Sequence, residues 1–339
     1  MLLVLYGHAL GVFPAYGDAV KPLVLAQLKI IYGFHMPIFF LLSGLVSRPR
    51  PWRQMARGAL ALLFTAYLVH AFCWACETLW MPGRPDWKGL LLPLVELRQF
   101  RSVIVWFLAA LALVQAVYFV LAATRWPLRV GLGVLVVLAF AWAQSRASNV
   151  FELSALLPGL VFYAAGRALV RTDWRQRLQR LRLPLALAGA VIALSLPLLN
   201  GGCGTSPTAQ CHNIPGGFIV VMVAGQYGFL PAFLIASAAA SLAVLWVSGR
   251  IAGGSPSATA GLSWVGRRSL PLLVINGLVI FFGHPLLLAW LGEAQRWSAL
   301  GVSVGLVVLQ LAVAGVAGRV VSLPLRLARW MAERVVPVR

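Results

Sequence analysis

The chain has 339 residues and a net charge of +20, and 61% of its residues are hydrophobic while only 11% are charged. A soluble globular domain is close to half apolar and a quarter charged, so this composition excludes that class. Continuous apolar runs of about 20 residues predict membrane-spanning helices and exclude a β-barrel, whose strands alternate. The positive charge does not indicate nucleic-acid binding, because most of the arginines lie in short loops where they set membrane topology.

The apolar runs predict an all-α polytopic bundle of about ten transmembrane helices, forming a single domain over residues 1–339. In chain order the predicted segments cover 1–13, 25–46, 58–80, 103–123, 128–143, 153–170, 183–199, 229–247, 270–291 and 299–321. Two shorter apolar pieces, 90–97 and 217–225, fit a re-entrant or interfacial position. The first segment is shorter than the roughly 17 to 25 residues that cross a bilayer. We therefore expect partial insertion or, preferably, a first helix truncated at its N-terminus.

The basic residues fall in alternate connections of this ten-helix arrangement. The connections after segments 2, 4, 6 and 8 and the C-terminal tail hold most of the chain's 28 lysines and arginines: Arg48, Arg50, Arg53, Arg57, Arg125, Arg129, Arg167, Arg171, Arg175, Arg177, Arg180, Arg182, Arg250, Arg267, Arg268, Arg319, Arg326, Arg329, Arg334 and Arg339. Loops rich in arginine stay in the cytoplasm. The pattern predicts that both termini are cytoplasmic. The connection after segment 6 is amphipathic and basic, as in a helix lying on anionic lipid.

Two histidines inside the first two segments are the main functional candidates. An ionisable side chain at membrane depth is costly and marks a functional site by default. At about 1.5 Å of rise per residue, His8 and His35 reach neighbouring depths on adjacent antiparallel helices. This arrangement suits a buried acid–base site. The commoner role of a lone membrane histidine is packing or hydrogen bonding, which we expect for His70. No H-x-x-x-H or H-E-x-x-H spacing occurs, so the sequence predicts no metal site.

The four cysteines form two pairs. Cys203 and Cys211 lie in a polar loop between segments 7 and 8, which the topology puts outside the cytoplasm, where disulfides persist. We predict a disulfide between them. Cys73 and Cys76 lie one helical turn apart in segment 3 without a βαβ pattern around them. They are expected to pack rather than to act in redox chemistry.

Four motifs, taken in chain order, resemble the membrane acyltransferase-3 family, and its fucose-4-O-acetylase-like group most of all. They are LLVLYGHALG with His8, FHMPIFFLLSG with His35 and Ser43, WFL with Trp106, and GRRSLPLLVINGL with Ser269 and Asn276. The resemblance covers essentially the whole chain. It implies an enzyme of the bacterial inner membrane that transfers an acyl group, acetyl above all, from cytosolic acyl-CoA to a hydroxyl of a cell-envelope or exopolysaccharide sugar.

The resemblance also implies residue roles. His8 matches the general base of the first helix, and His35 matches the histidine that would orient the hydroxyl or polarise the thioester carbonyl. Arg50 and Arg53 match an R-x-x-R that engages acyl-CoA after the second helix, with Arg57 as a neighbouring candidate. Guanidinium groups bind phosphate in a bidentate manner, which suits CoA.

Three departures from the family pattern leave other functions open. The family's basic residue about eleven positions before the first histidine would precede Met1. Asn276 stands where the family often has a histidine, so a proton-transfer role would be lost there while a hydrogen bond is retained. Ala66 replaces the proline before Tyr67. The alternatives are a transporter or flippase of a lipid-linked sugar, and a non-catalytic membrane subunit. A transporter is disfavoured because the sequence has no clear internal repeat and no paired broken helices in matching halves.

Overall fold

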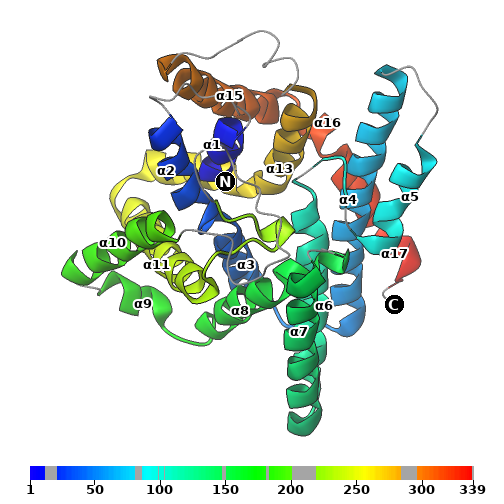
Figure 1. The fold of residues 1–339 in the computed structure, drawn as a ribbon, viewed down its shortest axis with the longest axis horizontal. Helices are drawn as coiled ribbons and strands as arrows, with labels where there is room; N and C mark the ends of the chain where they lie inside the picture. The colour runs from blue at the N-terminus through cyan, green and yellow to red at the C-terminus, as the bar shows by residue number, and fades with distance from the viewer. Residues whose placement is uncertain are drawn as a thin grey trace.

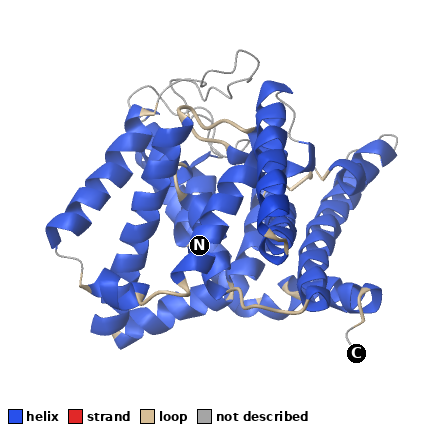
Figure 2. Ribbon diagram, turned by 90° about the horizontal axis from the view of Figure 1, so that it is seen from below, coloured by secondary structure: helices blue, strands red, loops and turns tan. Residues whose placement is uncertain are grey.

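The computed structural model describes residues 1–11, 21–80, 86–97, 99–102, 104–146, 150–180, 183–200, 219–283 and 296–337. Within these ranges the regular structure is helical, and Figure 2 shows most helices running side by side. The described residues contain no named strand, only an isolated bridge between Val221 and Gln226. The predicted all-α class is confirmed.

Figure 1 labels the principal helices along the chain. Their bounds are α1 Leu2–Gly11, α2 Lys21–Tyr32, α3 His35–Val46, α4 Trp52–Trp80, α5 Trp87–Glu96, α6 Trp106–Ala123, α7 Trp126–Arg146, η1 Val150–Glu152, α8 Leu153–Leu169, α9 Trp174–Gln179, α10 Leu183–Leu199, η2 Met222–Ala224, α11 Leu230–Gly254, α12 Pro256–Arg267, α13 Ser269–Leu278, η3 Val279–Gly283, α15 Arg296–Val316, α16 Gly318–Val321 and α17 Leu323–Val335.

The apolar helices follow the predicted segments in order. Within the described residues, five spans are long and apolar enough to cross a membrane, two further candidates are bent helix pairs, and three apolar helices are shorter. The short ones are Leu2–Gly11, Leu153–Leu169 and Pro184–Leu199, which correspond to predicted segments 1, 6 and 7. The chain is therefore a multi-pass membrane protein.

The second span is broken beside His35, and the sequence explains the break. Pro37 has no backbone N–H and its ring would clash with the carbonyl of residue 33, so a helix cannot continue unchanged through this point. Helix α2 ends at Tyr32 and α3 begins at His35. The freed carbonyl of Gly33 accepts a hydrogen bond of 2.5 Å from the buried Ser237 hydroxyl of α11. His35 thus occupies the first position of a new helix.

The ninth segment begins earlier than predicted. Helix α12 occupies 256–267, which the sequence analysis placed in a loop, and α13 follows after a bend of 63°. The local signal is a serine followed by a proline: the Ser255 side chain accepts a hydrogen bond from the backbone of Ala258, and Pro256 takes the first helical position. The helix therefore begins at these capping residues, ahead of the apolar run that starts at residue 270.

The tenth segment turns by 86° into a C-terminal amphipathic helix. Figure 1 places α17 beside α4, and it buries Leu325, Ala328 and Ala332. From the sequence, these residues were predicted to form an arginine-rich tail. The many arginines lower the mean hydropathy of this segment, although small and apolar residues recur in it with helical spacing.

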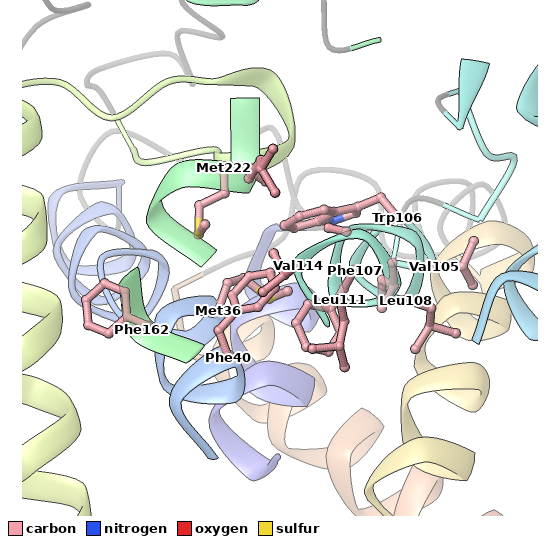
Figure 3. Packing of buried hydrophobic residues seen from close by; sticks show 14 of the residues in the cluster. Met36, Phe40, Val105, Trp106, Phe107, Leu108, Leu111, Val114, Phe162 and Met222 are labelled. Atoms are coloured by element: carbon pink, nitrogen blue, oxygen red, sulfur yellow. The ribbon is translucent and has the colours of Figure 1, made fainter. Parts of the chain in front are cut away.

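The main core joins α3, α6 and α8. Figure 3 shows Met36 and Phe40 of α3 close to α6, and the rings of Phe40 and Phe107 lie 5.1 Å apart. Helices α3 and α8 approach closely because Gly44 and Gly166 have no side chains: a Cβ at Gly44 would overlap the Tyr163 carbonyl oxygen, and one at Gly166 the Leu41 carbonyl oxygen. This packing fixes the helix that carries His35.

The cysteine predictions have different outcomes. Cys73 is buried in the main core and Cys76 is half-buried, and both are free. The predicted packing role of Cys73 is thereby confirmed. The predicted disulfide pair, Cys203 and Cys211, lies outside the described residues and stays a prediction.

Candidate active site

Helix α1 and the start of α3 bring the predicted histidines together. The ring centroids of His8 and His35 lie 5.8 Å apart, and Tyr32 completes an edge-to-face cluster at 4.7 Å from His35 and 5.8 Å from His8. The sequence analysis did not identify Tyr32. Its position three residues before His35, across the break in the span, was the available signal.

Each imidazole is held through Nδ1. The Nδ1 atom of His8 lies 2.8 Å from the side-chain oxygen of Asn276, and that of His35 lies 2.9 Å from the backbone oxygen of Ile31. Both oxygens only accept hydrogen bonds, so each Nδ1 carries the ring proton in this arrangement. Each Nε2 is then left with its lone pair. In this arrangement Nε2 is the nitrogen of each imidazole that is able to accept a proton.

A cavity of about 330 Å³ surrounds these histidines, and we call it the histidine cavity. His8, Tyr32, His35 and Trp106 line it, together with the backbone segment 220–223. Predicted candidate Trp106 thus lines the same cavity as both histidines. The cavity combines aromatic walls with a few polar groups, as small-molecule sites do.

A second cavity of about 700 Å³ lies on the other side of His35. Most of its lining is apolar, and we call it the apolar cavity. The predicted candidates Ser43 and Ser269 both line it, as does His35. His35 therefore borders both cavities, whereas His8 lines only the histidine cavity.

A third cavity of about 480 Å³ is basic, and we call it the arginine cavity. Its guanidinium groups come from Arg48, Arg50, Arg167 and Arg171, and it shares Ser43 and Val46 with the apolar cavity. The lining comes from the connection after α3, the C-terminal half of α6, and the end of α8 with the turn that follows it. The predicted clustering of arginines is thus observed for the connections after segments 2 and 6, whereas Arg125 and Arg129 of the connection after segment 4 do not line this cavity.

The three arginines predicted for the acyl donor have different surroundings. Arg50 lines the arginine cavity. Arg53 does not; its guanidinium stacks over the Trp52 ring at 5.6 Å. Arg57 lines a neighbouring cavity of about 500 Å³, but its Nη2 donates to the carbonyl of Val336 at 3.1 Å and so binds the end of α17. Of the three, Arg50 alone is directed to the arginine cavity.

Sequence reasoning assigned no individual role to Arg48, Arg167 or Arg171. Arg167 donates to the Ser47 carbonyl, and the Tyr163 hydroxyl donates to the Ser47 side chain at 2.9 Å, which ties α8 to the connection after α3. The signal available was that both connections are arginine-rich and predicted on one side. Among the described residues, no three His, Cys, Asp or Glu side chains are grouped to hold a metal ion.

The fold is that of a multi-pass membrane protein in which two buried, adjacent imidazoles line neighbouring cavities. The chain belongs to the acyltransferase-3 family, since the model of that family's acyltransferase domain matches residues 1–319. It is therefore an acyltransferase, and the family resemblance seen in the sequence is confirmed; the fucose-4-O-acetylase-like subgroup stays a prediction. No curated protein and no solved structure matches the chain significantly.

Proposed function

We propose that this acyltransferase is an O-acyltransferase of the bacterial inner membrane. It moves an acyl group, most simply acetyl, from cytosolic acyl-CoA to a hydroxyl of a cell-envelope or exopolysaccharide sugar. The observation that carries the proposal is the position of His35 between the apolar cavity and the histidine cavity. A donor and an acceptor that enter from opposite ends of the bundle would meet at the two imidazoles.

The donor is assigned to the arginine cavity. CoA carries phosphates, and Arg48, Arg50, Arg167 and Arg171 offer the planar, permanently charged donors that bind phosphate best. The adjoining apolar cavity leads toward His35 and suits the uncharged arm that ends in the thioester. This proposal keeps Arg50 and replaces Arg53 and Arg57 with arginines of α8 and its following turn.

The acyl transfer itself needs a base and a positioned carbonyl. The sugar hydroxyl gives its proton to Nε2 of His8 as its oxygen bonds to the thioester carbon. The carbon–sulfur bond breaks, and the proton passes from His8 to the leaving thiolate. His35 borders the donor path and orients the reacting groups in the histidine cavity.

The acceptor is assigned to the histidine cavity. Its aromatic walls, Trp106 and Tyr32, and its size of about 330 Å³ suit one sugar unit rather than a whole polymer. The free glycan and a lipid-linked sugar share this unit.

The two alternative functions have less support. A lipid-linked sugar transporter with inverted repeats would place broken helices in matching halves. Here the second predicted segment is interrupted between α2 and α3, whereas the bent helix pairs of the second half, α12–α13 and α15–α17, are the ninth and tenth segments and do not match it in position. A non-catalytic subunit was suggested partly by Asn276, yet Asn276 hydrogen-bonds His8.

Label transfer from radiolabelled acetyl-CoA in membranes containing the protein tests the proposal. Wild type should label the glycan or lipid-linked sugar fraction. The His8→Gln variant should lower transfer by about 10²- to 10⁴-fold, the usual contribution of a general base. Tyr6→Phe is the matched control, because it removes a hydrogen bond from the same helix to Gln27 without touching the cavity. Equal transfer by wild type and His8→Gln would remove His8 from the mechanism.

A further inference from the structure

A line of three polar side chains begins at His8 of α1 and crosses to two further helices. The side-chain oxygen of Asn276, on α13, lies 2.8 Å from Nδ1 of His8. Nδ2 of Asn276 donates a hydrogen bond of 2.8 Å to the side-chain oxygen of Gln310, on α15. Both amides are almost fully buried, with 1% of each residue exposed. Gln310 is more than 300 positions from His8 in the chain, and it lines none of the three cavities of the site.

The surroundings of this line are apolar. Leu5, Leu272, Ile275 and Ala314 form a buried cluster between the same three helices. A buried amide in such surroundings is costly unless it is paired, and its hydrogen bonds are stronger there than in water. Helix packing alone would be served by aliphatic residues at both positions. The Asn276 amide is paired through both of its polar atoms and Gln310 through its oxygen, while Nε2 of Gln310 has no hydrogen-bond partner among the described residues. Two buried amides kept here at that cost point to a role in fixing the side chain at the end of the line.

The direction of the line decides the chemistry of His8. An asparagine amide presents either its oxygen or its NH₂ group to a neighbour. The Gln310 oxygen takes the NH₂ group of Asn276, and this turns the Asn276 oxygen toward His8. His8 is then protonated at Nδ1 and basic at Nε2. If the Asn276 amide were reversed, its NH₂ group would face Nδ1 and the ring proton would move to Nε2. Nε2 of His8 would then have no lone pair with which to accept a proton.

We propose that Gln310 is a positioning residue that sets the tautomer of His8 through Asn276. Its consequence for catalysis rests on the proposed function, but its consequence for the tautomer does not. Gln310 makes no contact with substrate in this role. It selects which nitrogen of His8 is available as the base.

The tautomer is measured directly by nitrogen NMR on protein labelled with ¹⁵N-histidine in lipid nanodiscs. The His8→Gln variant identifies the His8 signals. Wild type should show His8 protonated at Nδ1, and Gln310→Glu should preserve this form because a carboxyl oxygen still accepts from Asn276. Gln310→Leu should populate the Nε2-protonated form. A wild-type ring protonated at Nε2, or a Gln310→Leu spectrum identical to wild type, would overturn the proposal. Gln310→Met serves the same purpose if the leucine variant does not accumulate.

Kinetics supply the second readout. Gln310→Leu should lower kcat by about 10-fold or more with little change in KM for acetyl-CoA, and Gln310→Glu should recover most of the loss. In an Asn276→Asp background both terminal atoms of side chain 276 are oxygens, so an oxygen faces Nδ1 of His8 whichever way the carboxylate is turned. Gln310→Leu should then lower kcat by less than about 3-fold. Equal losses in the two backgrounds would contradict the proposal. An inactive wild type with the expected NMR tautomers would count against the function and not against the positioning role.

Discussion

Arg50 and Arg53 form a natural pair for testing the donor site at the scale of single residues. They belong to one R-x-x-R motif, but Arg50 lines the arginine cavity whereas Arg53 stacks on Trp52. Arg50→Ala should raise KM for acetyl-CoA by about 10-fold or more, the loss expected for one charge-assisted phosphate contact. Arg53→Ala should change it by less than about 2-fold. Steady-state kinetics in membranes measure both values, and equal effects would refute the assignment.

The sequence identified the central residues of the site but not those that position them. His8 and His35 stood out because a titratable group in an apolar run is costly. Asn276 was found only through the family motif, and Gln310 looked like one polar residue in a long apolar helix. Its role depends on a neighbour 34 positions away, which local patterns do not reveal. Arg167 and Arg171 were missed for the same reason.

At the scale of elements, the break before α3 should be needed for activity more than for stability. Pro37→Ala supplies an N–H to residue 37, which competes with Ser237 for the Gly33 carbonyl and favours one continuous helix. His35 would then shift relative to His8. We expect at least a 10-fold loss of acyl transfer with an unchanged or higher melting temperature. Pro93→Ala in α5, far from the histidines, is the control. Full activity of Pro37→Ala would show that the break has no catalytic role.

The contact between α3 and α8 should be the most sensitive to added volume. Gly166→Ala puts a Cβ onto the Leu41 carbonyl oxygen and should destabilise the fold by about 1–3 kcal/mol. Gly131→Ala in α7 is the matched control, because open space surrounds that position, and it should be neutral or slightly stabilising. Thermal unfolding in detergent compares the two. Similar stabilities would contradict the packing of α3 against α8.

Apolar length predicted which elements exist, and local backbone chemistry decided where they end. The predicted segments correspond to the apolar helices in order. The break at Gly33 was not predicted because apolar residues continue through it, although Pro37 supplied the physical cause. Helix α12 was missed because its small and polar residues lack an apolar run, while Ser255 and Pro256 start it. Helix α17 was read as a charged tail because arginines flank its buried stripe.

At the scale of the whole molecule, the orientation in the membrane is testable without a substrate. Two single cysteines are introduced into a variant that lacks the four native cysteines: Thr172→Cys and Lys88→Cys. Position 172 follows Arg171 of the arginine cavity, and position 88 lies on α5, near the opposite end of α4. The positive-inside rule predicts that a membrane-impermeant maleimide labels only Lys88→Cys in intact spheroplasts. Permeabilised cells should label both. Labelling of Thr172→Cys alone in intact spheroplasts would invert the proposed topology and move the donor cavity outside.

The most direct test of the account uses sealed vesicles of defined orientation. Radiolabelled acetyl-CoA does not cross a bilayer, so its side of addition decides which cavity it reaches. Inverted vesicles, with the arginine cavity facing the added donor, should transfer label to the envelope glycan or lipid-linked sugar fraction. Right-side-out vesicles, and inverted vesicles with His8→Gln, should not. Transfer in right-side-out vesicles, or transfer that survives the loss of His8, would contradict a reaction that joins a donor from the arginine end to an acceptor at the histidines.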